Sequence, residues 1–122
     1  MKRAKVVAVV FALACLVVSG ASSQAASTRP YIFGLLLVGP YNDRGYSQAH
    51  YDGGRYVEKT VPGTRMIYID KVNPSDRPGV TIVQLVDDMV EKGARLIIAN
   101  SDDMKDGIRE AARKHPATHF VH

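Results

Sequence analysis

Cysteine is nearly absent from this chain of 122 residues, and the single one, Cys15, lies in an apolar run near the start. The rest of the chain can therefore form neither a disulfide nor a thiolate metal site. The four histidines show no metal-ligand spacing. Since strand residues alternate between faces, His119 and His122, three apart on and after an expected strand, should point to opposite faces. The sequence therefore predicts no metal site.

The common motifs of cofactor binding and nucleophilic catalysis are also missing. There is no G-x-G-x-x-G and no Walker loop, because Gly34 stands alone within an apolar run. Ser47 and Ser101 have no plausible base nearby, and no nucleophile elbow is visible. We therefore expect no cofactor and no enzymatic activity; a secreted α/β enzyme remains an alternative that would need a nucleophile–base or metal set.

The apolar run at residues 6–18 is only 13 residues long, which is too short to span a bilayer comfortably. Basic residues precede it, and Ser23-Gln24-Ala25 fits a small-x-small cleavage site. This pattern predicts a secretory signal peptide over residues 1–25 and a short mature segment over residues 26–30. We therefore expect an exported protein of the periplasm or cell surface. The alternatives are a retained anchor and lipidation at Cys15, although Ala12 stands where a lipobox has leucine.

The excess of positive charge is small once the predicted signal peptide is left out of the count. The formal net charge of +4 includes Lys2, Arg3 and Lys5; without them, 13 lysines and arginines face 12 acidic residues, a net charge of +1. The remaining basic residues form no cluster that would follow a phosphate backbone. Nucleic acid is therefore not an expected partner.

What the sequence does contain is a regular alternation of strand and helix patterns. Residues 31–38 form a continuous apolar run typical of a buried strand, and shorter apolar segments follow at 66–69, 96–99 and 118–121. The segments 45–60, 81–92 and 100–114 between them are predicted helices. Gly93 is placed to end the second of them. The order β-α-β-α-β-α-β predicts an α/β fold, a Rossmann-like parallel sheet with right-handed crossovers and helices on both faces.

In such a sheet every turn from strand to helix falls at one edge. Residues 39–46, 70–80 and 100–104 should therefore meet there, where open α/β sheets bind their ligands. The middle turn is long, and it suits either the border of a cleft or an exposed loop.

The first of these turns carries the side chains best suited to a small, flat, polar ligand. Asp43 could accept hydrogen bonds from sugar hydroxyls or base N–H groups, and Tyr46 could stack on a ring. Asn42 and Ser47 could add directional hydrogen bonds. The competing interpretation is structural: Asp43 caps the helix and Tyr46 packs against its first turn. Both interpretations can hold at once.

The third turn offers the hydroxyl of Ser101 and the carboxylates of Asp102 and Asp103, and helix capping is again the alternative. Acidic residues after the first and third strands also occur in receiver domains, where they hold a divalent ion and accept phosphate. The predicted export signal argues against a phosphorelay role.

Three segments together resemble the basic membrane protein family of solute-binding components of ABC importers, which are similar to purine-nucleoside receptors. They are residues 33–49 (FGLLLVGPYNDRGYSQA), residues 70–74 (DKVNP) and residues 111–116 (AARKHP). The resemblance covers nearly all of residues 31–122 and depends on the order and spacing of the segments. It implies a type I periplasmic binding fold, a nucleoside or nucleobase-like ligand and an ABC permease as partner.

Carried onto this sequence, the resemblance gives the acidic ligand-binding role to Asp43 or to the position of Asn42, and the stacking role to Tyr46. Ser47 stands where nucleoside binders often have Asn. The third turn, usually rich in glycine and aromatic residues, is altered here, so the ligand can differ from a purine nucleoside. Ser101 and Asp102 would be the contacts there.

The family has two lobes that close on the ligand, and residues 31–122 correspond to the first part of one lobe, so we expect a truncated fragment. A ligand-sensing module for a membrane receptor would use the same fold, and the sequence does not separate it from transport.

Overall fold

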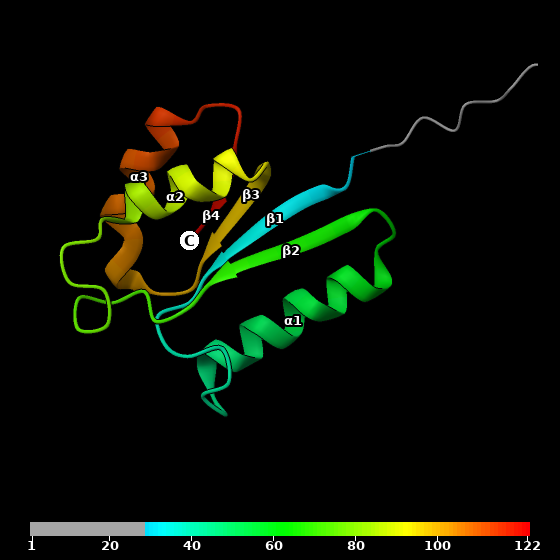
Figure 1. Ribbon diagram of the computed structural model, residues 1–122, viewed down its shortest axis with the longest axis horizontal. Helices are drawn as coiled ribbons and strands as arrows, with labels where there is room; N and C mark the ends of the chain where they lie inside the picture. Colours follow the sequence, from blue (N-terminus) through cyan, green and yellow to red (C-terminus); the bar gives the residue numbers. More distant parts are fainter. Residues whose placement is uncertain (1–28) are drawn as a thin grey trace, which may run out of the picture.

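The computed structural model describes residues 29–122, so the predicted signal peptide and Cys15 lie outside the described residues. The predicted fold class is confirmed. The strands form one parallel sheet in the order β2-β1-β3-β4 (Figure 1). They are β1 (Tyr31–Leu36), β2 (Thr64–Ile69), β3 (Ala94–Ala99) and β4 (His119–Val121). The helices are α1 (Tyr46–Thr60), α2 (Ile82–Glu91) and α3 (Lys105–Lys114), and a short 3-10 turn, η1 (Asp102–Met104), precedes α3.

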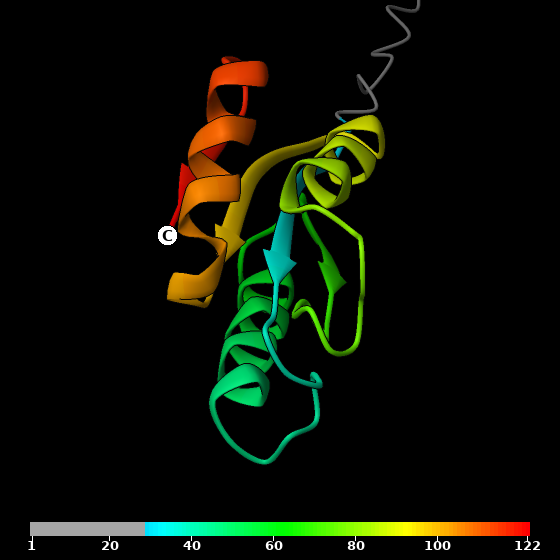
Figure 2. The ribbon, with the colours of Figure 1, turned by 90° about the vertical axis from the view of Figure 1, so that its left-hand side faces the viewer.

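Helices cover both faces of the sheet, α1 on one side and α2 with α3 on the other (Figures 1 and 2). This arrangement follows from right-handed crossovers: the chain moves from β1 to β2 in one direction and from β2 to β3 and β4 in the other. Two buried clusters result. The α2–α3 side includes Leu36, Val86, Met89, Ile97, Met104 and Ile108, and the α1 side includes Phe33, Leu35, Leu37 and Met66.

Gly54 lets α1 press closely on the sheet. A Cβ atom at Gly54 would overlap the Met66 sulfur and lie 2.9 Å from Leu35 Cδ1, whereas a Cβ at Gly53 would meet nothing within 4 Å. The helix therefore needs a glycine at position 54 for its packing and has no such need at position 53.

The helices on the other face are held together near the C-terminal end of α3. Asp87 of α2 accepts hydrogen bonds from Lys114 Nζ at 2.6 Å and His115 Nε2 at 2.6 Å. These bonds, chiefly the one from Lys114, lower the pKa of the Asp87 carboxyl.

The two ends of α2 are set by local signals. The helix begins with a capping box between Thr81 and Gln84. After its end, Gly93 takes a positive φ of 92°, as predicted for this glycine from the sequence.

Two element boundaries differ from the sequence prediction. β1 ends at Leu36 and not at residue 38; Val38 bonds the side chains of Asn100 and Asn73 in place of a neighbouring strand. The N-terminus of the third helix was expected to be capped by side chains from residues 100–103. Instead, Ser101 makes no side-chain capping hydrogen bond, and the chain enters α3 through η1.

Candidate functional site

The three strand-to-helix turns meet at the carboxyl edge of the sheet, as predicted. Lys71 N–H donates to the Gly39 carbonyl at 3.1 Å, which joins the second turn to the first. Asn100 N–H donates to the Leu36 carbonyl at 3.1 Å, which joins the end of β3 to the end of β1. Because β2 and β3 flank β1 and the chain leaves β1 and β3 on opposite faces, this edge is the switch point at which α/β sheets bind ligands.

Two asparagines hold the end of β1 from either side. Asn100 Oδ1 accepts a hydrogen bond from the Val38 N–H at 2.9 Å. Asn73 Nδ2 donates to the Val38 carbonyl at 2.9 Å. The two side chains thus satisfy the backbone of Val38 just beyond β1, and they tie the second and third turns to the first.

Asp43 is used to start α1. Its carboxylate accepts hydrogen bonds from the N–H groups of Gly45 (2.8 Å), Ser47 (3.0 Å) and Gln48 (3.0 Å). The bond from Gln48 is the main cause that lowers the pKa of Asp43, with a partial opposing effect of desolvation. The capping interpretation of Asp43 is therefore confirmed.

Ser47 and Asn42 have different surroundings. The Ser47 side chain is fully buried, and its Oγ accepts the Gly39 N–H at 3.0 Å, so it holds the first turn against the helix. Asn42 is exposed in that turn. Neither residue, nor Asp43, lines the hollow described next.

A shallow hollow of about 250 Å³ lies beside the start of α1, between it and the end of β3. It brings together three of the side chains that the sequence singled out, Tyr46, Ser101 and Asp102. Tyr46 is 60% exposed, so its ring is free to meet a ligand. The remaining lining residues are His50, Ile98, Ala99, Asn100, Val121 and His122.

Two histidines of this hollow were not among the predicted site residues. His50 Nδ1 donates to the Tyr46 carbonyl at 2.9 Å, and its ring packs edge-on against the Tyr46 ring with centroids 4.6 Å apart. The i, i+4 spacing of this pair on α1 is a signal that the sequence offered. His122 Nε2 donates to the Ser101 carbonyl at 2.9 Å; only the register of β4 beside β3 reveals that contact.

On the α1 face, next to the first turn, Tyr41, Tyr51 and Tyr68 form a second aromatic cluster with ring centroids 4.9–5.5 Å apart. Desolvation, with the neighbouring tyrosines, raises the pKa of Tyr68. The Tyr41 N–H also donates to Asp70 Oδ2 at 3.1 Å. The cluster therefore anchors the first turn to β2.

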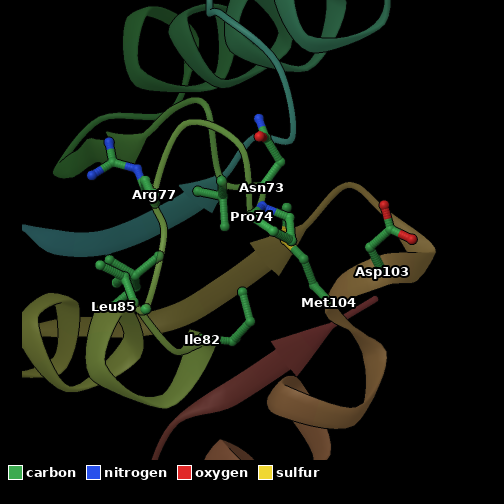
Figure 3. Close-up of a pocket in the computed structure, with 10 residues that line it drawn as sticks. Asn73, Pro74, Arg77, Ile82, Leu85, Asp103 and Met104 are labelled. Carbon is green, nitrogen blue, oxygen red and sulfur yellow. The ribbon is translucent and has the colours of Figure 1, made fainter.

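A second hollow, of about 490 Å³, lies between the loop after β2 and η1 (Figure 3). Its walls include Val72, Pro74, Ile82, Leu85 and Met104. The polar groups around it are directed elsewhere: Arg77 donates to the Asp70 carbonyl through Nε and Nη2, and the Asp103 carboxylate points away from Met104 (Figure 3). The middle turn thus borders this hollow and not the one beside Tyr46.

Within residues 29–122, no group of three or more histidine, cysteine, aspartate or glutamate side chains is arranged to hold a metal ion. In the same part of the chain, no helix combines the length and apolar character needed to cross a membrane.

The parallel sheet with helices on both faces and a hollow at its carboxyl edge is an α/β, Rossmann-like arrangement, a class that binds ligands at this edge. The family model described as ABC transporter substrate-binding protein PnrA-like matches residues 31–122. The chain therefore belongs to this family, Bmp, and the resemblance seen in the sequence is confirmed.

A solved structure similar to this chain is that of an ABC transporter solute-binding protein from Conexibacter woesei DSM 14684, with a TM-score of 0.62 and 14% sequence identity. The match covers 74% of this chain and 28% of that chain, so this chain spans well under half the length of its structural neighbour. At this identity the likeness establishes the fold alone. Among curated protein sequences, none matches this chain.

Proposed function

We propose that this chain is part of the exported solute-binding component of an ABC importer, which binds a nucleoside or nucleobase-like ligand and delivers it to a membrane permease. Membership of the substrate-binding family supports the general role. The observation that carries the ligand assignment is the exposed ring of Tyr46 beside the polar groups of Ser101 and Asp102 in one hollow. We assign no chemical step to these residues.

The side chains of this hollow suit a flat ring with polar edges. Tyr46 can stack on the ring, and its own ring packs edge-on against His50. The Ser101 hydroxyl can donate or accept, and the Asp102 carboxylate can accept hydrogen bonds from N–H or O–H groups of the ligand. Asp43 and Ser47 contribute indirectly, because their bonds to backbone N–H groups fix the first turn and the start of α1.

The hollow alone is one wall of a binding site. Its volume of about 250 Å³ falls below the roughly 300–1,000 Å³ usual for small-molecule pockets. We propose that a second lobe supplies the opposing wall, as expected for a chain that matches 28% of its structural neighbour. The affinity of the 122-residue chain for a nucleoside should therefore be weak, and an assay that detects weak binding is needed.

We propose that residues 1–25 direct export and that the protein acts outside the cytoplasmic membrane, as substrate-binding proteins of ABC importers generally do. N-terminal sequencing of the secreted protein tests this part: a mature chain beginning at residue 26 is expected, and an intact Met1 would contradict it.

The ligand assignment is tested by saturation-transfer NMR on the purified chain with inosine, adenosine and hypoxanthine, with glucose as a non-aromatic comparison. We expect transfer to the purines and a strong loss in Tyr46→Ala, because a stacked base contributes about 1–3 kcal/mol, roughly 5- to 150-fold in affinity. Tyr56→Ala is the matched control, since Tyr56 lies on the same helix, is 68% exposed and is not part of the hollow. Equal transfer to all three proteins, or none to any purine, would reject the assignment.

A further inference from the structure

In the side-chain amide of Asn100, the oxygen has a hydrogen-bond partner, whereas the nitrogen has none among the described residues. Its Oδ1 accepts the Val38 N–H at 2.9 Å, which fixes the orientation of the amide. The residue is only 6% exposed, and its Nδ2 is buried without a hydrogen-bond partner among the described residues. A buried donor left without a partner is unfavourable, and buried polar groups usually have one.

The contrast with Asn73 shows that this is not the ordinary state of an asparagine at this edge. Asn73 Nδ2 donates both to the Val38 carbonyl at 2.9 Å and to Asp76 Oδ2 at 2.7 Å. Its Oδ1 accepts the N–H groups of Ser75 and Asp76 at 3.0 and 2.9 Å. Asn73 is therefore satisfied by the fold, whereas the donor of Asn100 is not.

Asn100 also lies where a ligand would be. It follows the last residue of β3 and lines the hollow together with Tyr46 and Ser101, at the switch point of the sheet. Tyr46 is exposed, so its ring is accessible to a ligand. The unpartnered donor and the stacking surface thus belong to one concave site, although one follows β3 and the other begins α1.

We propose, resting on the proposed function, that Asn100 selects the ligand: its Nδ2 donates to acceptor atoms on the edge of the ring that stacks on Tyr46. Because Oδ1 accepts the Val38 N–H, the group of this amide that is left without a partner is Nδ2, which can only donate. A 6-oxopurine presents two adjacent acceptors, O6 and N7, on one edge, whereas a 6-aminopurine presents a donor beside N7. The chain therefore prefers inosine to adenosine.

The experiment is a titration of the 15N-labelled 122-residue chain with inosine and, separately, adenosine, following the side-chain amide signals of Asn100 and Asn73. We expect inosine to shift the Asn100 signal and to leave that of Asn73 in place. Asn100→Asp tests the selection, since a carboxylate keeps an acceptor for the Val38 N–H and replaces the donor by a second acceptor. The ratio of inosine to adenosine affinity should fall about tenfold or more in this variant, in line with the 1–3 kcal/mol of a matched base-edge contact.

Two results separate the failure of this inference from the failure of the proposed function. If inosine shifts signals of the Tyr46 region while the Asn100 side-chain amide stays fixed, the donor has another partner, such as a trapped water, and the inference is wrong alone. If neither nucleoside shifts any signal of the hollow, the nucleoside assignment and this inference are both wrong. Should Asn100→Asp not fold, the response of the Asn100 amide in the unmodified chain decides.

Discussion

The ionisation state of Asp43 affects the stability of the first turn. Because three backbone N–H groups bind its ionised form, the pKa of Asp43 is lower in the folded chain than in the unfolded chain. The stability that it contributes is thus fully present above the unfolded pKa, which is about 3.9 for aspartate, and is lost as the pH falls through the lower folded pKa.

Asp43→Asn should therefore be clearly less stable than the unmodified chain near neutral pH, and the difference should shrink at pH 3 and below. Urea unfolding of both proteins at pH 6.5 and in acid measures this. Asp103→Asn, at an exposed position of η1, is the control and should differ little from the unmodified chain at either pH. A deficit for Asp43→Asn that is the same at both pH values would show that charge on Asp43 has no part in capping.

At the same scale, the sequence identifies the polar residues at this edge of the sheet. It does not show which of them bind the backbone and which are free to contact a ligand. Asp43 and Ser47 carry groups that could equally bind a ligand or the backbone, and that choice depends on the Gly39 N–H and on the exact path of the turn. The importance of Asn100 was also hidden, because its Oδ1 bonds a residue 62 positions away. Tyr46, Ser101 and Asp102 were correctly placed at a common edge because parallel strands put their turns together.

At the scale of elements, the contact between α1 and the sheet is set by one glycine. Gly54→Ala should destabilise the fold by about 1–3 kcal/mol, the usual cost of overpacking, because its Cβ would collide with Met66 and Leu35. Gly53→Ala, one position earlier, should stabilise it by roughly 0.5–1 kcal/mol through helix propensity alone. Thermal or urea unfolding of the pair measures both, and a Gly54→Ala variant as stable as Gly53→Ala would contradict the packing described.

The elements themselves follow closely from sequence pattern. The apolar run of β1, the i, i+3, i+4 stripe of α2 and the stop at Gly93 are local signals that the tertiary structure does not override. The start of α3 was predicted less well. Asp102 pairs with Lys105 at 3.5 Å on the surface and does not cap the helix, and the sequence pattern does not distinguish these two uses of an aspartate near a helix start.

At the scale of the whole molecule, the α1 face is less covered than the opposite one among residues 29–122. A mostly apolar hollow between α1 and the sheet is lined by Phe33, Leu35, Ala49, Val57 and Ile98, among others, and Val121 of β4 is exposed on the neighbouring strand. The ligand hollow beside Tyr46 is likewise open. Both features fit a lobe that matches 28% of a larger solute-binding protein.

The most direct test of the account asks where a purine lies on this chain, because two hollows border the same edge of the sheet. Intermolecular NOEs between inosine and the isotope-labelled chain measure this. The account predicts NOEs from the purine protons to the ring of Tyr46 and to Ser101. NOEs to Ile82, Leu85 and Met104 instead would place the ligand in the hollow of Figure 3 and contradict it.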